Sequence, residues 1–155
     1  MRNRAMFVQS ADGDRLQVLG STMTVKTTSD DTAGTMEWVV VESGPGGDVL
    51  AHRHPWGEAY YILGGTVEVH VGASRHHATP GDLVTIPPRA LHGFRVMSDS
   101  CRFLHVSIGA GATAAFRDYA AVSSDAPDFN DLDTVAALLE VNARHGVEIV
   151  APELV

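Results

Sequence analysis

Two histidines separated by one residue, His52 and His54, give the strongest chemical signal in the sequence, and Glu58 and His92 extend it. Successive side chains of a β-strand point to opposite faces, so His52 and His54 leave the same face of a predicted strand. Glu58 opens the next predicted strand. Imidazole and carboxylate donors together suit Fe, Mn, Ni, Cu or Zn. Three histidines and one glutamate would leave two positions of a six-coordinate ion for water, dioxygen or substrate, as metal catalysis requires.

The elements that must position these side chains are predicted to be strands. Short segments rich in Val, Ile, Thr and aromatic residues run from about Arg15 to Ile108, with Gly, Pro, Asp and Ser between them. This pattern predicts an all-β sandwich or barrel. Gly64-Gly65 is predicted to be a two-residue hairpin connection. The predicted strands are Leu16–Leu19, Thr22–Thr27, Thr35–Glu42, Val49–His54, Glu58–Leu63, Thr66–Val71, Arg75–Ala78, Leu83–Ile86, Leu91–Val96 and Arg102–Ile108.

The composition changes after Gly109, where the sequence becomes helical in pattern. A short Ala-rich helix is predicted over Ala112–Ala121, and a second over Asp131–His145, capped by Asp131 or Asp133 and ended by Gly146. We therefore expect a β-barrel over residues 1–110 and a helical C-terminal extension over residues 111–155 that packs on the barrel.

The spacing of the candidate ligands resembles the two sequence motifs of the cupin family. The first motif is Gly, five residues, His-x-His, three or four residues, Glu, six residues and Gly. The second is Gly, five residues, Pro-x-Gly, two residues, His, three residues and Asn. Fifteen residues separate the two blocks here, as in compact single-domain bacterial cupins of the quercetin dioxygenase-like group. The matching positions are Gly46, His52, His54, Glu58, Gly65, Gly81, Pro87 and His92.

This resemblance implies a double-stranded β-helix, or jelly-roll barrel, with one divalent metal ion held inside by His52, His54, Glu58 and His92. Two positions depart from the second motif: Arg89 replaces the glycine, and Val96 replaces the asparagine. Neither position is a ligand in the family pattern, so the metal site survives both changes. The glycine serves a tight turn that favours positive φ, so Arg89 must adopt a different turn or bear strain.

Four further residues are candidates for a substrate pocket beside the metal. Alternation places Tyr60 on the inward face with Glu58, and Phe94 on the face of His92. Trp56 lies in the turn between ligands, at the expected cavity mouth, and His105 lies in a late strand that can face the cavity. The alternative for the three aromatic residues is barrel core, and for His105 ordinary packing. A mostly apolar pocket with a metal anchor would suit a flat aromatic or enol-type ligand.

The cupin fold hosts many reactions, so it does not decide the function. The leading hypothesis is an oxidoreductase, a mononuclear dioxygenase in which Glu58 is either a fourth ligand or the catalytic base that takes a substrate hydroxyl proton. One alternative is a cyclase or isomerase that uses Zn²⁺ as a Lewis acid. Another is a non-catalytic cupin that binds a small molecule. The metal identity separates the first two.

Composition limits the partners and the compartment. Eleven basic against nineteen acidic residues give a formal net charge of −8, which argues against nucleic acid or an anionic membrane as a partner. No apolar run approaches the roughly 18 residues of a membrane-spanning helix. Arg2 and Arg4 begin the chain, but polar Gln9, Ser10 and Asp12 follow too soon for a signal peptide. We expect a cytoplasmic, unprocessed protein.

Residues outside the candidate site have ordinary interpretations. Cys101 is the single cysteine and is predicted to be a small buried side chain. A homodimer is implied by the resemblance, because edge strands of such barrels are commonly covered by a partner, and the N-terminal strands could serve here. The other histidines are assigned to the surface or to a helix end; they are His70, His76, His77 and His145.

Overall fold

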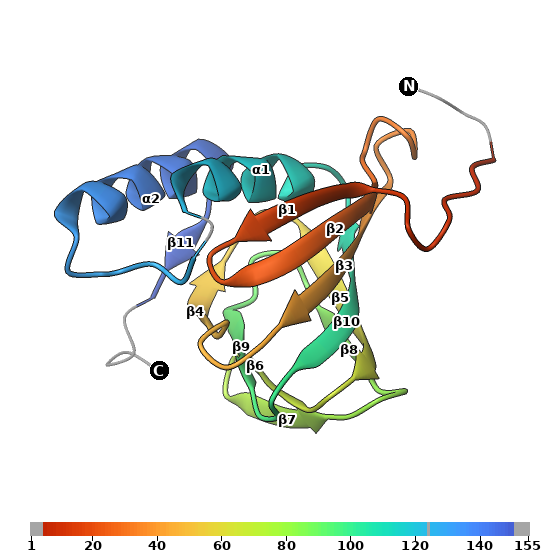
Figure 1. Cartoon of the computed structure of the whole chain (residues 1–155), viewed down its shortest axis with the longest axis horizontal. Helices are drawn as coiled ribbons and strands as arrows, with labels where there is room; N and C mark the ends of the chain where they lie inside the picture. The colour runs from red at the N-terminus through yellow and green to blue at the C-terminus, as the bar shows by residue number, and fades with distance from the viewer. Residues whose placement is uncertain (1–4, 124, 151–155) are drawn as a thin grey trace.

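The computed structural model describes residues 5–123 and 125–150, so Arg2 and Arg4 of the expected chain start lie outside the described part. Two antiparallel sheets face each other and curve into a barrel (Figure 1). The larger sheet has the strand order β1 (Asp14–Val18), β2 (Ser21–Thr27), β3 (Met36–Ser43), β10 (Cys101–Ile108), β5 (Gly57–Gly64) and β8 (Leu83–Ile86). The smaller sheet has the order β11 (Glu148–Ile149), β4 (Val49–Arg53), β9 (His92–Val96), β6 (Val67–Val71) and β7 (Ser74–Ala78).

The predicted jelly-roll architecture is confirmed, and each predicted strand is present with its ends displaced by two residues at most. Two helices follow the barrel strands, α1 (Ala112–Val122) and α2 (Leu132–His145). Alternation fills the interior, because the inward residues of both sheets form one apolar cluster that includes Val39, Ile62, Val69 and Phe103. Cys101 is buried in this cluster, as predicted. In the described part of the chain, neither helix has the length and apolar character needed to cross a membrane.

The prediction of a hairpin at Gly64-Gly65 is wrong, because β5 and β6 belong to different sheets. This turn instead carries the chain from one sheet to the other. Gly65 has φ +74°, and a Cβ atom there would lie 2.1 Å from the carbonyl oxygen of Ser100 and 2.8 Å from the Cα of Cys101. The close approach of the loop before β10 therefore requires glycine at this position.

Arg89 occupies the turn between β8 and β9, where the family pattern has glycine. Its φ of +62° lies in the left-handed region, so the residue bears the strain that the motif glycine avoids. The backbone N–H of Arg89 donates to the carbonyl oxygen of His54 at 2.9 Å. The turn therefore ties the approach to β9 directly to the second histidine.

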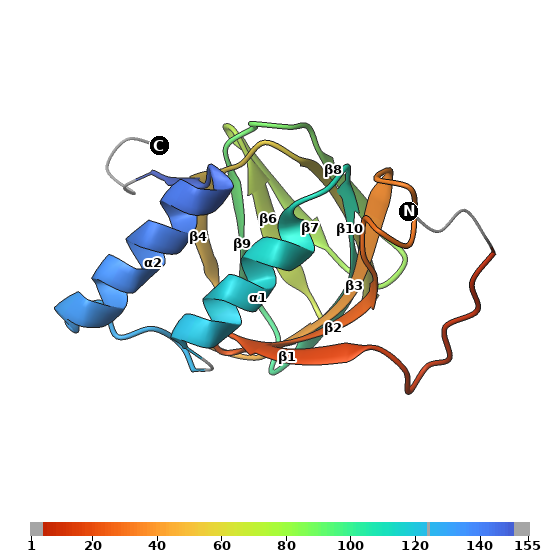
Figure 2. The same ribbon diagram turned by 90° about the horizontal axis from the view of Figure 1, so that it is seen from above.

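Helix α1 lies across one end of the barrel (Figure 2). Its buried face, with Ala112 and Ala115, packs on Trp56 and on Val147, which follows α2. Asp131 caps α2 as predicted, accepting from the backbone N–H of Asp133, and Gly146 ends the helix with φ +67°. The chain then forms β11, which the sequence did not reveal and which pairs with the outer edge of β4.

The N-terminus of α1 is held by a carboxylate from the barrel rather than by a local cap. Gly111 at the N-cap offers no side chain. Glu37 of β3, only 1% exposed, accepts hydrogen bonds from the backbone N–H and the hydroxyl of Thr113 at 2.9 and 2.7 Å. It also accepts from the backbone N–H of Ser29 at 3.2 Å. One buried side chain thus fixes the helix to the barrel.

We expect Glu37→Ala to lower the free energy of unfolding by about 2 kcal/mol, because it removes a helix cap and leaves buried donors without an acceptor. Urea denaturation followed by circular dichroism measures this change. Glu42→Ala on the same strand is the matched control: its ion pair with Arg102 is about half exposed, so the loss should stay below about 0.5 kcal/mol. Equal losses in the two variants would contradict the anchoring role.

Candidate metal centre

Three histidines converge at the barrel end that α1 covers. His52 is on β4, His54 follows it in the next turn, and His92 begins β9 as the register partner of His52. One ligand nitrogen from each lies within 4.8 Å of the others. His54 and His92 are buried, and His52 is half-buried. The predicted convergence of these three side chains is therefore present.

The backbone fixes which ring nitrogen of each histidine faces the common centre. In all three rings, Nδ1 lies 2.8–3.0 Å from a backbone carbonyl oxygen two residues away. A carbonyl oxygen can only accept, so Nδ1 carries a proton, and in the neutral ring Nε2 presents its lone pair. Backbone hydrogen bonds of this kind orient imidazole ligands toward a metal. The carbonyls belong to Leu50, Trp56 and Ala90.

The arrangement of the candidate ligand atoms favours a bound cation. His54 Nε2 and His92 Nε2 are buried and have no hydrogen-bond partner among the residues that the structure describes. They lie 2.9 and 3.4 Å from the two carboxylate oxygens of Glu58. Lone pairs therefore face lone pairs, an arrangement that a positive charge between them would stabilise. A divalent ion that accepts imidazole nitrogen fits these residues.

Glu58 lies beside the triad at the centre of a buried polar cluster. It is 3% exposed; Trp56 Nε1–H donates to Oε1 at 2.9 Å, and the Tyr60 hydroxyl donates to Oε2 at 2.6 Å. His105 Nε2 is 3.0 Å from Oε1. Burial raises the pKa of Glu58, but His105 and the neighbouring histidines outweigh burial and hold this pKa well below its usual value. Glu58 is therefore a carboxylate.

The surroundings shift the pKa values of the neighbouring groups in different directions. Burial and the neighbouring His92 lower the pKa of His52 to about 4, which leaves its ring neutral and able to bind a metal at neutral pH. Burial also lowers the pKa of His92, but contact with the Glu58 carboxylate outweighs it and the net shift is upward. Burial and the Glu58 charge raise the pKa of Tyr60 well above its usual value, so the phenol stays protonated and donates.

The predicted pocket residues surround this cluster at different depths. Trp56 is 7% exposed and stacks on the His54 ring, with centroids 4.1 Å apart, beneath α1. Tyr60 and Phe94 belong to the apolar core, where both rings contact Phe103. His105 points inward, its Nε2 toward Glu58 and its ring 5.5 Å from that of Tyr60. The four side chains are thus brought together, with Trp56 under the helix rather than at an open mouth.

Two contributors to the site were not identified from the sequence. Phe116 of α1 lies over His105, with ring centroids 5.4 Å apart at 69°. Ser107 of β10 is fully buried and lies opposite Glu58 in the register. Phe116 is one of two aromatic residues, with Tyr119, that an Ala-rich segment packs against the barrel end, which is the signal that could have found it. Nothing in the local sequence distinguishes Ser107.

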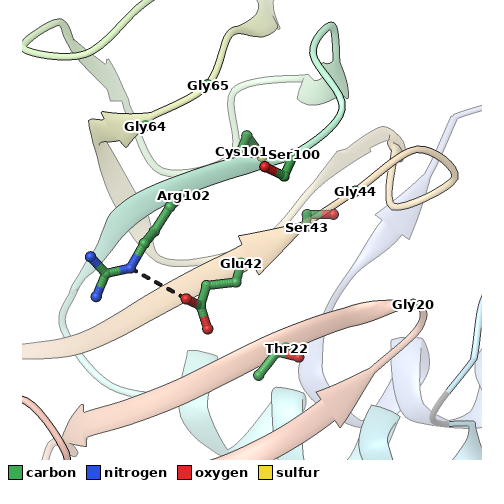
Figure 3. A pocket seen from close by; sticks show the side chains of 10 residues that line it. All are labelled: Gly20, Thr22, Glu42, Ser43, Gly44, Gly64, Gly65, Ser100, Cys101 and Arg102. Atoms are coloured by element: carbon green, nitrogen blue, oxygen red, sulfur yellow. Dashed lines mark ion pairs between the residues drawn. The ribbon is translucent and has the colours of Figure 1, made fainter.

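Two surface hollows lie away from the triad. One, of about 460 Å³, opens at the opposite end of β5 and β10, where Gly64, Gly65 and Cys101 line it and Arg102 pairs with Glu42 (Figure 3). The other, of about 590 Å³, lies along β7 and β8. Neither includes any of the three histidines.

Comparisons with known proteins agree with this geometry. Residues 38–107 match the family model described as Cupin domain, a segment that contains all three histidines. No curated protein matches the sequence significantly.

Solved structures resemble the fold at low sequence identity. An RmlC-like cupin from Shewanella frigidimarina matches 74% of this chain and 99% of its own, with 17% identity and a TM-score of 0.63. A predicted oxalate decarboxylase from Thermotoga maritima matches 67% of this chain and 99% of its own, with 22% identity and a TM-score of 0.59. The polyketide cyclase RemF from Streptomyces resistomycificus matches 68% of this chain and 80% of its own, with 24% identity and a TM-score of 0.57.

We expect the purified protein to take up one zinc or cobalt ion per chain, and His92→Ala to weaken that binding at least about tenfold, because a buried ligand is lost from a closed set. Metal analysis after dialysis measures the stoichiometry, and competition with a chromophoric chelator measures the affinity. His77→Ala is the control, since His77 is exposed on β7. Unchanged affinity in His92→Ala would contradict the site.

Proposed function

Since this chain is a cupin by its fold and by its match over residues 38–107, we propose that it is a metal-dependent oxidoreductase, a mononuclear dioxygenase that acts on a small aromatic or enol-type molecule. The ion would be held by His52, His54 and His92, with Glu58 as a fourth ligand or as the base. The observation that carries this proposal is the set of Nε2 lone pairs directed toward one another and toward the Glu58 carboxylate.

The residues around Glu58 support an acid–base role for it. The hydroxyl of Tyr60 and the indole N–H of Trp56 hold its two oxygens in place, so the carboxylate is oriented before a substrate binds. Glu58 would then accept the proton of a substrate hydroxyl. Trp56 packs under α1 at this end of the barrel, which would limit the access of water to Glu58.

When bound, the ion would supply positive charge beside the substrate oxygen and redox chemistry toward dioxygen. Dioxygen is the oxidant in this proposal. Both of its atoms would enter the product, so the reaction needs no external reductant.

A second candidate is a cyclase or isomerase that uses Zn²⁺ as a Lewis acid. The likeness to a polyketide cyclase supports it at the level of fold, and so does the aromatic surrounding of the triad. A third is a non-catalytic binding cupin, which ligand would stabilise thermally without forming product. The cytoplasmic location and the exclusion of nucleic acid and membrane partners stay predictions from composition.

We expect the protein loaded anaerobically with Fe(II) to consume oxygen with at least one flavonol, diketone or catechol, and Glu58→Gln to lower that rate about 100-fold, because the amide cannot accept the proton. An oxygen electrode measures the uptake. Glu42→Gln, on the outer face of β3, serves as the control. No uptake with any of the three classes, from protein with full iron occupancy, would reject the dioxygenase in favour of the Lewis-acid or binding candidates.

We also propose that the protein is a homodimer that buries the outer face of the larger sheet. Val40, Leu104, Tyr61 and Leu83 lie in one register row across β3, β10, β5 and β8. Their side chains point away from the core, and Leu83 and Tyr61 are 60% and 42% exposed. When both faces of a sheet are apolar, burial of each face against another element or another chain is favoured.

The charge distribution favours a second copy of this chain as the partner that covers this face. On these four strands, the charged residues that point outward are Glu42 and Arg102, and they neutralise each other in an ion pair of 3.4 Å. The chain as a whole carries a formal charge of −8, so two copies repel each other less at this face than over an average surface. A two-fold contact needs a patch that suits itself, and a neutral apolar row does.

We expect light scattering to give twice the 16.5 kDa chain mass for the wild type and a single chain mass for the double variant Tyr61→Lys, Leu83→Lys, because the two copies would then bring four lysines together. Leu132→Lys, at an exposed position of α2, is the control and should remain dimeric. A wild-type mass of one chain would reject the dimer, and a dimeric double variant would reject this face.

A further inference from the structure

After the metal site is accounted for, two buried polar atoms near the triad have no hydrogen-bond partner within residues 5–123 and 125–150. They are Nδ1 of His105 and Oγ of Ser107. His105 is 4% exposed and Ser107 is not exposed at all. A buried polar atom without a hydrogen bond is costly, so such atoms in proteins usually meet a ligand, an ion or an ordered water.

Both atoms come from one strand and lie beside Glu58. His105 and Ser107 are two apart on β10 and therefore share its inward face. In the register of the larger sheet, Ser107 lies opposite Glu58 of β5 on one side and opposite Glu37 of β3 on the other. His105 lies opposite Tyr60. The pair thus forms a polar strip along β10, adjacent to the carboxylate of the metal centre.

The hydrogen-bonding capacity of the strip defines the chemistry that it can bind. His105 Nε2 is 3.0 Å from Glu58 Oε1; a carboxylate only accepts, so Nε2 carries a proton, and in the neutral ring Nδ1 offers a lone pair. A group that binds Nδ1 must therefore donate. The Ser107 hydroxyl can donate to an oxygen or accept from a hydroxyl. Residues two apart on a strand are about 7 Å apart, which is too far for one atom to bond both.

We propose that His105 and Ser107 form a subsite for a ligand with two oxygen groups, in which one hydroxyl donates to His105 Nδ1 and a second oxygen bonds the Ser107 hydroxyl. Catechols, enediols and vicinal hydroxyketones have this chemistry, whereas a monohydroxylated aromatic can fill only one position. The rings of Tyr60 and Phe116 flank His105 and supply an apolar surface for the carbon skeleton. The inference rests on the proposed function to the extent that it places the substrate in the same barrel end.

The test compares 4-nitrocatechol with 4-nitrophenol, two chromophoric probes that differ by one hydroxyl. Protein loaded with Zn²⁺, which is redox-inert, is titrated with each probe by absorbance, so that binding is measured without turnover. We expect Ser107→Ala to raise the Kd of 4-nitrocatechol about fivefold and to change that of 4-nitrophenol less than twofold. His105→Phe, which keeps a planar ring but has no acceptor, should have an effect on 4-nitrocatechol at least as large. Ser74→Ala, at an exposed position of β7, is the control.

A thermal melt separates this role from a structural one. The Ser107 hydroxyl has no partner in the described part of the chain, so Ser107→Ala should leave the melting temperature unchanged or raise it. A lower melting temperature would identify Ser107 as a structural residue and overturn the inference. Equal affinity of the wild type and Ser107→Ala for 4-nitrocatechol would also overturn the inference. So would failure of both probes to bind. Either result would indicate that the strip on β10 holds only a buried water.

The subsite and the metal centre can fail separately. Metal analysis of the same samples reports the ion, and titration of the metal-free protein reports the strip on β10. If zinc does not bind but the metal-free protein still discriminates the two probes through Ser107, the proposed function fails and the subsite stands. If zinc binds and the protein does not discriminate the two probes, the subsite fails and the metal centre stands.

Discussion

The repulsion between buried lone pairs is the constraint on which this barrel end depends. Backbone carbonyls hold the Nδ1 protons of three histidines, so their Nε2 lone pairs face inward, and Glu58 adds carboxylate oxygens at 2.9 and 3.4 Å. Rotating any one ring to relieve the contact would give up a backbone hydrogen bond. The fold therefore supplies the orientation, and a cation supplies the compensating charge.

The barrel contributes this orientation through strand pairing rather than through local sequence. The antiparallel register places His52 opposite His92, and the turn at Arg89 bonds back to the His54 carbonyl despite its left-handed backbone. Such strain persists only where the surroundings fix the conformation. Positions of the two sequence blocks that are distant along the chain thus become neighbours in space.

Much of this arrangement could be predicted, because alternation and ligand spacing are local signals. The strand positions, the inward faces of Glu58, Tyr60 and His92, and the Asp131 cap follow from them. The crossing at Gly64-Gly65 could not, because a glycine pair fits a hairpin as well as a close approach to a loop 35 residues later. The role of Glu37 was hidden for the same reason: its partner Thr113 is 76 residues away.

The placement of α1 has a kinetic consequence. Trp56 and His105 are covered by this helix, and among the three histidines only His52 keeps appreciable exposure. A molecule as large as a catechol that passes through this end of the barrel must displace aromatic side chains of the helix or its neighbours, while Glu37 keeps the first turn attached. Ligand exchange would then require a local opening of α1 around Phe116, and the residence time of a bound molecule would reflect helix stability more than the strength of its own contacts.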